Sequence, residues 1–232
     1  MSSKQRITVI SSMATKALLA DLTAQFQQAH PDIDVHVESV GGVDAAKRVQ
    51  AGEVIDVVAL ASDAIERLAA AGHLAAGTRV DMVRSAVAVA VPAGTARPDI
   101  STEEALKAAV LAAPTLGYST GPSGVQLARL FERWGIAEQI APRIVTPPPG
   151  VPVGSLVAKG EVALGFQQLS ELMNLPGIEL LGGMPEAVQI VTIFSAARSA
   201  VSTRNEAVDR FLRFVASPAT AAIKQRHGMA PA

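Results

Sequence analysis

Apolar residues recur along this chain at two different spacings, one typical of strands and the other of helices. Residues 7–10 form a short β-branched run, and Leu18, Leu22 and Phe26 then follow at intervals of four. The run predicts a strand, and the wider spacing predicts an apolar stripe along one face of a helix. Because the same succession returns throughout the chain, the pattern predicts βα units around mostly parallel sheets.

The remaining strands and helices follow from the same two spacings. Further strands are expected at 33–37, 54–60, 83–91, 115–118, 144–145, 162–166 and 188–194. Further helices are expected around 43–50 and 153–159, around the stripes that contain Leu68, Val110 and Phe131, and twice at the C-terminus. Ser62 or Asp63, and the Ser101/Glu104 pair, fit N-terminal caps, whereas Gly72, Gly135 and Gly160 fit helix ends.

Composition narrows the class of protein. The chain has 232 residues, of which 49% are hydrophobic, 18% charged and 3% aromatic, and its formal net charge is −1. These values exclude a disordered chain, and they give neither the basic surface of a nucleic-acid-binding protein nor a platform for stacking bases. The absence of cysteine excludes disulfides, thiolate metal ligands and a cysteine nucleophile. A globular protein that handles a small molecule, with no nucleic-acid partner, is the class that remains.

The N-terminal segment bears on localisation. Residues 1–6 are polar and lead directly into the first predicted strand, without the basic start, apolar stretch and small-residue cleavage site of a secretory leader. No apolar run reaches the roughly 20 residues that span a bilayer. We therefore expect a cytoplasmic protein, or a periplasmic one from which a signal peptide has been removed, and no membrane contact unless a transporter is its partner.

Several common catalytic motifs are absent from the sequence. Neither GxGxxG nor GxxxxGK[ST] follows any predicted strand, which counts against a nucleotide-dependent dehydrogenase or an NTPase. No GxSxG elbow is present, and the 4 histidines show no metal-ligand spacing such as HExxH. We therefore expect neither a metal nor a cofactor.

Three loops that follow predicted strands combine hydroxyl groups with the start of a helix. They are Ser11-Ser12-Met13, Ala61-Ser62-Asp63 and the longer segment 119–124. Ligands of open α/β sheets bind where the strands end, and a helix N-terminus attracts negative charge. Each loop therefore fits either an anion-binding site or an ordinary N-cap. The 119–124 segment favours binding, because a single cap does not require two glycines and three hydroxyl groups.

Two further features could contact an anion. Gln167 and Gln168 follow the predicted strand 162–166, where a pair of amides could donate to and accept from a carboxylate. A solvent-exposed helix start explains the same pair equally well. Arg84, near the beginning of a predicted strand, could pair with a carboxylate or lie free on the surface.

The residues in and around these loops resemble a known family. Residues 7–12, Gly41-Gly42 and the segment 56–63 are similar to the first lobe of type II periplasmic binding proteins, the molybdate-binding branch in particular. Residues 118–125 (YSTGPSGV), 157–161 (VAKGE) and 165–172 (GFQQLSEL) are similar to the aconitate isomerase branch of that superfamily. The resemblance covers nearly the whole chain.

The resemblance implies a two-lobed α/β fold, in which each lobe holds a mixed, mostly parallel sheet flanked by helices. Lobe 1 would comprise residues 1–82 and 195–232, and lobe 2 would comprise residues 83–194. The segments 83–91 and 188–194 would be the two hinge strands. The ligand would lie in the cleft between the lobes, lined by the loops described above.

The resemblance also implies a function. The chain would bind a small organic carboxylate anion and isomerise it without a cofactor, by a 1,3-proton shift like that of aconitate isomerisation. This step needs a base with a pKa near neutral and a group that stabilises an enolate-like charge. Helix N-termini could supply the second, whereas the catalytic residues stay unknown. The alternative is a solute-binding protein of an ABC transporter for carboxylates or molybdate-like oxyanions.

The residues expected to contact the ligand come from all of these segments. They are Ser11, Ser12, Met13, Gly41, Gly42, Ala61, Ser62, Arg84, Ser119, Thr120, Gly121, Ser123, Gly124, Val125, Gln167 and Gln168. Among them the hydroxyls of Ser12, Ser62 and Ser123 would donate to the anion. Arg84 would supply a countercharge, and Gln168 an orienting amide.

Overall fold

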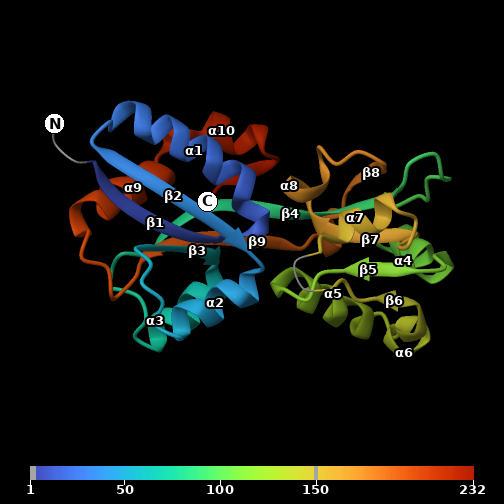
Figure 1. The fold of residues 1–232 in the computed structure, drawn as a ribbon. Coiled ribbons are helices and arrows are strands. Elements are labelled where there is room, and N and C mark those ends of the chain that lie inside the picture. Colours follow the sequence, from blue (N-terminus) through green and yellow to red (C-terminus); the bar gives the residue numbers. More distant parts are fainter. Residues whose placement is uncertain (1–3, 149–150) are drawn as a thin grey trace. The chain divides into compact units, whose positions relative to one another are not determined.

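The computed structural model describes residues 4–148 and 151–232 and divides into two compact units (Figure 1). Unit 1 consists of the chain up to Arg84 together with Ile193–Ala232, and unit 2 is Ser85–Thr192. Two strands, β4 (Val80–Pro92) and β9 (Val191–Arg198), contain the positions where the chain passes from one unit to the other. The lobe boundaries expected from the sequence each lie two residues from these positions.

The sheet of unit 1 is mixed. Its strands follow the order β2 (Ile33–Val40), β1 (Gln5–Ser12), β3 (Val57–Ala61), β9 and β4, and β10 (Met229–Pro231) also pairs with β4. β1 runs parallel to both β2 and β3, whereas β9 is antiparallel to β3. The register places Ser11 opposite Ser39 on one side and opposite Ala59 on the other. The carboxyl ends of β1, β2 and β3 therefore lie at one edge of the sheet.

Helices cover both faces of this sheet (Figure 1). On one face pack α1 (Lys16–Ala29), α9 (Asn205–Ala216) and residues from α10 (Ala221–Arg226), around a core that includes Phe26 and Phe211. On the other face pack α2 (Gly42–Gln50) and α3 (Ser62–Ala70), around Ile65 and Leu68. Because both faces are covered, all five residues of β3 are buried, as its continuous apolar run predicts.

Unit 2 repeats this plan with shorter strands. The order is β4, β7 (Leu164–Gln168), β5 (Leu116–Tyr118) and β6 (Ile144–Val145), and β8 (Ile178–Gly183) pairs with β4. β5 is parallel to β6 and β7, whereas β4 is antiparallel to β7 and β8. Both units thus confirm the α/β class with mixed sheets flanked by helices.

Two separate apolar clusters cover the faces of the second sheet. One joins α4 (Glu103–Ala112), α5 (Pro122–Arg133) and α6 (Ala137–Ile140) to the face of β7 that carries Phe166. The other contains residues of α7 (Val153–Ala158) and α8 (Leu169–Leu172). Along β7, neighbouring side chains point to opposite faces. Phe166 and Gln168 therefore share one face, and Gln167 points to the other.

The structure corrects the boundaries of several predicted strands. β3 begins at Val57 rather than at residue 54, and Val54 is 80% exposed. β7 continues through Gln168 instead of ending at Phe166, and β9 begins at Val191 after a short 3₁₀ helix, η3 (Glu186–Val188). An apolar run indicates which residues are buried but not which residues pair with a neighbouring strand, so it does not predict where a strand begins and ends. The short strands β8 and β10 have no counterpart among the predicted strands.

The helix ends agree with prediction better than the helix starts. Gly72 and Gly160 have φ of +80° and +76°, as residues just beyond a helix end require. The capping residue of α3 is Ala61, so the prediction that Ser62 or Asp63 caps it is wrong. The cap of α4 is Thr102, whose Oγ1 accepts from the Ala105 N–H at 3.1 Å, rather than Ser101. Across residues 4–148 and 151–232, no helix has the length and apolarity to cross a membrane.

Candidate functional site

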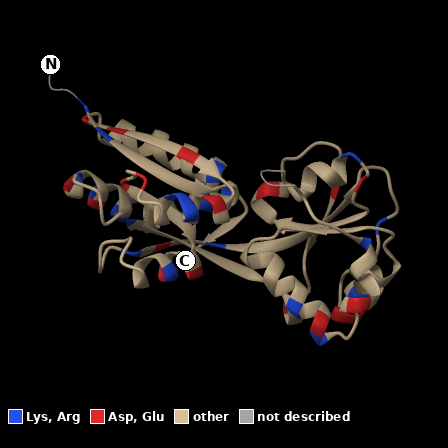
Figure 2. Cartoon of the chain, turned by 60° about the horizontal axis from the view of Figure 1, so that its bottom comes forward, with Lys and Arg blue, Asp and Glu red and all other residues tan. Residues whose placement is uncertain are grey.

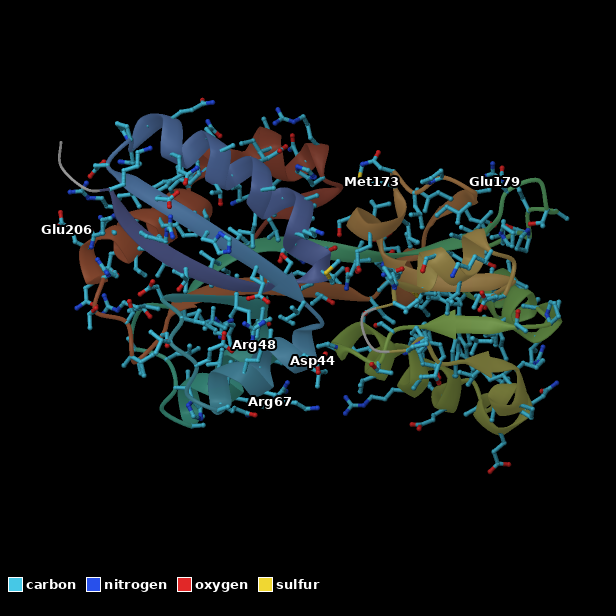
Figure 3. All side chains as sticks on the ribbon, in the orientation of Figure 1. Asp44, Arg48, Arg67, Met173, Glu179 and Glu206 are labelled. Atoms are coloured by element: carbon cyan, nitrogen blue, oxygen red, sulfur yellow. The ribbon has the colours of Figure 1, made fainter. Side chains whose placement is uncertain are left out.

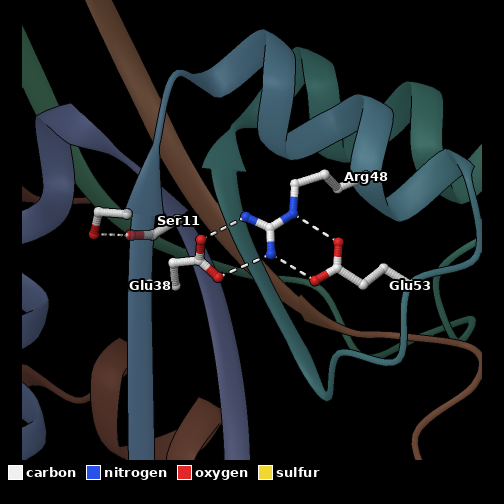
Figure 4. A network of polar contacts seen from close by, with 5 residues as sticks. Ser11, Glu38, Arg48 and Glu53 are labelled. Atoms are coloured by element: carbon white, nitrogen blue, oxygen red, sulfur yellow. Dashed lines mark hydrogen bonds and ion pairs between the residues drawn. The ribbon is translucent and has the colours of Figure 1, made fainter. Parts of the chain in front are cut away.

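In unit 1, the carboxyl ends of β1 and β2 bring three serine hydroxyls to one edge of the sheet. Ser11 is fully buried, and its Oγ lies 2.7 Å from Oγ of Ser39 (Figure 4). Ser12 is 8% exposed, and its Oγ has no hydrogen-bond partner among the residues that the structure describes. A Cβ on Gly42 would lie 3.6 Å from Cβ of Ser12. The Ser12 side chain, with its unpaired hydroxyl, therefore lies beside the first turn of α2.

The helices that begin at this edge leave their first N–H groups free of side-chain caps. Gly41 is the N-cap of α2 and Ala61 that of α3, and no described side chain caps either helix. This result removes the alternative explanation that Ser62 serves as an N-cap. The first turns do carry acids: Asp44, labelled in Figure 3, lies close to Gly41. Asp63 pairs with Arg67 at 2.9 Å. Unit 1 thus offers an anion neutral hydrogen-bond donors rather than excess positive charge.

A charge network fixes the end of β2 next to these groups (Figure 4). The guanidinium of Arg48 on α2 donates to both carboxylate oxygens of Glu38 on β2, at 2.6 and 2.8 Å, and its Nε donates to Glu53 at 2.6 Å. Hydrogen bonds from Arg48 lower the pKa of both glutamates. Because Glu38 precedes Ser39, the network holds the strand end that carries the Ser39 hydroxyl. Arg48 is thereby committed to two carboxylates of its own chain.

Two other residues of unit 1 that were predicted to contact the ligand are Met13 and Arg84. Met13 begins a 3₁₀ helix, η1 (Met13–Thr15), which separates β1 from α1, so α1 does not follow Ser12 directly. Arg84 is exposed on β4 at the end of unit 1, and the described part of the chain gives it no ion pair. Its guanidinium is available to a ligand, whereas that of Arg48 is not.

In unit 2, the loop after β5 leads into α5, which begins at Pro122. The cap is Gly121, and no side chain described by the structure caps the helix, so Ser123 lies within the first turn, with Oγ 3.4 Å from Oγ of Ser119. A Cβ on Gly124 would lie 1.6 Å from the carbonyl oxygen of Ser119. Gly124 therefore lets the chain's own loop approach the helix, whereas we had expected glycine to let a ligand approach.

A pocket of about 170 Å³ adjoins this loop. Its lining joins hydroxyl groups of the loop to apolar side chains of α5 and β6. The lining residues are Tyr118, Ser119, Thr120, Gly124, Val125, Ala128, Ile144 and Thr146. Such a pocket suits a ligand with a hydrocarbon part beside its polar groups.

Gln167 and Gln168 are buried inside β7, at 5% and 4% exposure, so their interpretation as an exposed helix start is wrong. Gln167 is engaged at both ends of its amide. Its Oε1 accepts from the N–H of Gly154 at 2.8 Å, and its Nε2 donates to Oε1 of Glu171 at 2.8 Å. Gln167 thus holds the start of α7 and a carboxylate in place.

Gln168 points to the opposite face and is only half satisfied. Its Nε2 donates to Oγ1 of Thr192 at 2.9 Å, but its Oε1 has no partner within residues 4–148 and 151–232. The Oγ of Ser85, which is fully buried, is unpaired in the same way. Val87 lies opposite Gln168, so Ser85, two residues before Val87, shares the face of Gln168. A buried polar atom without a partner is costly, so both atoms call for a water or a ligand.

Four residues of these edges were missed by sequence reasoning: Ser39, Ser85, Thr192 and Glu171. Ser39 is the penultimate residue of β2, two residues before Gly41, a position that could have drawn attention to it. Nothing in the pattern marks Glu171, yet burial raises its pKa to about 7. No cluster of three or more His, Cys, Asp or Glu suited to a metal ion occurs among the described residues.

Comparison with known proteins relates this geometry to a family. Residues 7–230 match the family described as bacterial extracellular solute-binding proteins. The chain is 34% identical over 232 residues to an aconitate isomerase of a Pseudomonas species, covering 97% of this chain and 87% of that protein. The relationship inferred from the sequence is therefore confirmed.

Solved structures show the same fold at lower identity. The periplasmic molybdate-binding protein of Azotobacter vinelandii superposes with a TM-score of 0.79 at 18% identity, over 97% of this chain and 98% of that one. The sulfate-binding protein SubI of Mycobacterium tuberculosis H37Rv gives 0.78 at 15% identity, over 98% and 87%. The chain belongs to the bacterial extracellular solute-binding proteins.

Proposed function

We propose that this protein binds a small organic carboxylate at the strand ends described above and isomerises it without a cofactor, by moving a proton between two carbons. The observation that carries the proposal is the 34% identity, along nearly the whole chain, to an aconitate isomerase. Aconitate is an unsaturated tricarboxylate, so we expect a substrate with a carbon–carbon double bond next to carboxylate groups.

Neutral donors would hold the carboxylates. The first N–H groups of α2, α3 and α5 lack side-chain caps, and Ser12 adds a buried hydroxyl without a described partner. Such donors stabilise an anion and, equally, the negative charge that develops when a carbon acid loses its proton. Arg84 supplies a full positive charge.

The pocket of unit 2 favours an organic ligand over an inorganic oxyanion. Tyr118, Val125 and Ile144 give it apolar walls beside the hydroxyls of Ser119 and Thr120. An inorganic tetrahedral anion has no surface that would gain from these walls, whereas a carbon chain does.

The proposed reaction conserves every atom. A base removes a proton from the saturated carbon next to a carboxylate, and the electron pair joins the double bond as an enolate-like anion. The protonated base then returns a proton, its own or one exchanged with solvent, to the far carbon of the allylic system, which leaves the double bond shifted and the base restored. The reaction needs no oxidant or reductant.

Proton NMR in deuterated buffer tests the proposal, with cis-aconitate, trans-aconitate and related unsaturated acids as substrates. We expect interconversion of isomers and exchange of the allylic C–H positions. If the protein neither interconverts nor exchanges any member of the panel, the enzymatic part of the proposal is wrong.

A second candidate is a binding protein for a transporter. Its support is the fold shared with molybdate- and sulfate-binding proteins, and the family description as extracellular favours the periplasmic alternative for localisation. A thermal-shift screen separates the two, because a bound ligand raises the melting temperature by mass action. Stabilisation by molybdate or sulfate and by no carboxylate would favour this second function.

A further inference from the structure

We infer that Glu171 is the base that carries the proton in the proposed isomerisation, and that Gln167 is the residue that positions it. The inference rests on the proposed function and names the group that sequence reasoning left unknown.

Glu171 lies at the edge of the unit 2 sheet where ligand-binding groups gather. It belongs to α8, which directly follows β7, and β7 runs parallel to β5 with Tyr118 opposite Phe166. The carboxyl end of β7 and the 119–121 loop after β5 therefore lie at the same edge. Glu171 thus lies at the same edge of the sheet as the hydroxyl loop, on the α7 and α8 side of the sheet, whereas α5 and the pocket lie on the other side.

No other acid or imidazole competes for the role in the segments that follow β5, β6 and β7. Within the described parts of those segments, 119–121, 146–148, 151–152 and 169–173, Glu171 is the one ionisable side chain. The 4 histidines of the sequence all lie outside unit 2. A base at this edge must therefore be Glu171.

A chain of two hydrogen bonds fixes the carboxylate. The Gly154 N–H donates to Gln167 Oε1, and Gln167 Nε2 donates to Glu171 Oε1, each at 2.8 Å. Because Gln167 is buried, its amide has little freedom to turn away. The second oxygen of Glu171, Oε2, accepts no hydrogen bond within the described chain and is the one that can reach a substrate.

Among the residues that the structure describes, no cation forms an ion pair with this carboxylate. β7 and β8 are the strands packed against α8. β7 has no charged residue, and the charged residue of β8, Glu179, pairs with Arg97 at 2.8 Å (Figure 3). Burial raises the pKa of Glu171, and the hydrogen bond from the Gln167 amide lowers it. Burial has the larger effect, so the pKa rises to about 7. A base with this pKa is half ionised at neutral pH and returns its proton readily.

In the proposed step, Oε2 of Glu171 takes the proton from the saturated carbon as the C–H bond breaks. The neutral carboxylic acid then gives that proton to the far carbon, and the carboxylate is restored. A single group serves both halves of the shift, and solvent deuterium enters the substrate whenever the protonated Glu171 exchanges its proton before returning it.

The first test compares Glu171→Gln with wild-type protein, using NMR for turnover and calorimetry for binding. We expect Glu171→Gln to lower kcat by at least about 100-fold and Glu171→Asp to recover part of it, because the shorter acid keeps the base. Kd for the carboxylate should stay within about threefold. Glu161→Gln is the matched control, since Glu161 is an exposed acid of the same unit, and it should leave all values unchanged.

The second test asks whether Gln167 acts through Glu171. Wild-type kcat should rise with pH through a limb near 7, because Glu171 works as the ionised base. Gln167→Ala removes a donor that favours the carboxylate, so the limb should move to higher pH. A purely structural Gln167 would lower the rate at every pH and leave the limb in place. This readout also covers the case in which Glu171→Gln fails to fold.

The outcomes separate the two proposals. If wild-type protein isomerises the acid and folded Glu171→Gln does so at a similar rate, the role of Glu171 is wrong while the proposed function stands. A limb that does not move in Gln167→Ala overturns the positioning role. If wild-type protein binds the acid but neither interconverts its isomers nor exchanges any C–H position, the isomerase function is wrong and the role of Glu171 with it.

Discussion

At the scale of single residues, the informative groups are those whose hydrogen-bonding capacity the chain leaves unused. Ser11 and Ser39 satisfy one another, so their hydroxyls have a structural role. The hydroxyls of Ser12 and Ser85 and the amide oxygen of Gln168 are buried and unpaired within the described residues. Thr23 Oγ1, inside α1, is unpaired in the same way, but these three atoms belong to residues of β1, β4 and β7, and proteins rarely leave buried polar atoms without a partner.

Ser12→Ala tests this reasoning. The hydroxyl has no described partner in the protein, so its removal should leave the melting temperature nearly unchanged. If the hydroxyl meets a buried anion, binding should weaken by about 1–3 kcal/mol, and the same loss is expected for Ser123→Ala. Ser217→Ala is the control: Ser217 Oγ accepts from the Ala219 N–H at 3.2 Å, so this variant should lose stability but not affinity. Unchanged affinity in Ser12→Ala would exclude the hydroxyl from the site.

Glu171 gives a pH-dependent prediction about stability that does not depend on activity. Its pKa in the folded protein, about 7, lies above the ordinary 4.5, so the folded state holds the proton more tightly than the unfolded state. Folding stability therefore falls as pH rises from about 4.5 to 7. Glu171→Gln removes this loss, and we expect it to gain on the order of 1–3 kcal/mol over wild type between pH 4.5 and pH 8.

Denaturant unfolding of both proteins at the two pH values measures this difference, with Glu161→Gln as the control. A constant gap between Glu171→Gln and wild type at both pH values would contradict the raised pKa.

Sequence reasoning reached the hydroxyl loops but not the acid. Ser12, Ser62 and Ser123 could be found because they stand between a strand pattern and a helix pattern. Glu171 stands in a short LSEL segment, where the same letters are typical of an exposed helix turn. Its carboxylate is positioned by Gln167, which in turn accepts from Gly154. Gly154 is distant in sequence, and Gln167 lies inside a strand whose end was predicted two residues too early.

At the scale of elements, the starts of α2, α3 and α5 share one property. Each begins at a glycine or alanine cap, and no described side chain caps it. By contrast, α4 follows β4, which runs antiparallel to β7, and it has an ordinary side-chain cap, Thr102. Glycine and alanine have no side-chain oxygen that could accept from the first N–H groups, so those groups stay available to an acceptor from outside the chain.

Gly124 allows a test of the α5 start. A Cβ at this position would lie 1.6 Å from the Ser119 carbonyl oxygen, so Gly124→Ala must displace the loop from the helix. We expect a loss of about 2–4 kcal/mol in the free energy of unfolding, and weaker carboxylate binding. Gly121→Ala is the matched control, because its Cβ would meet only Ser119 Oγ at 3.8 Å, and it should be tolerated. Equal stability of the two variants would contradict the close approach.

The elements were predictable to the extent that one face of each is buried in a regular period. The apolar stripe of Leu18, Leu22 and Phe26 gave α1, and the continuous run of β3 gave a strand covered on both faces. Starts and ends were less accurate, because they depend on ladder partners and on single cap bonds. Thr102 rather than Ser101 caps α4, because α4 begins at Glu103 and Thr102 is the residue directly before it, whereas the Ser101 N–H donates to Asp99 at 2.8 Å.

At the scale of the whole molecule, charge is balanced and dispersed. Lys and Arg lie among Asp and Glu over both units (Figure 2), and the net charge is −1. Many of these charges are paired on the surface, as Arg48 is with Glu38 and Glu53 and as Arg79 is with Glu66. The protein as a whole therefore has no strong positive field with which to attract an anion. The division into two units was not evident from the hydrophobic pattern alone and came from the family resemblance.

This balance predicts how binding responds to salt. If neutral N–H and hydroxyl donors hold the carboxylate, ionic strength screens little of the interaction. Kd measured by calorimetry should rise by no more than about threefold between 50 and 500 mM sodium chloride, and the remaining slope should come from the exposed Arg84. Arg84→Ala should then weaken binding at low salt and remove most of the slope. A much steeper rise of Kd in wild type, unchanged in Arg84→Ala, would mean that cations other than Arg84 hold the ligand.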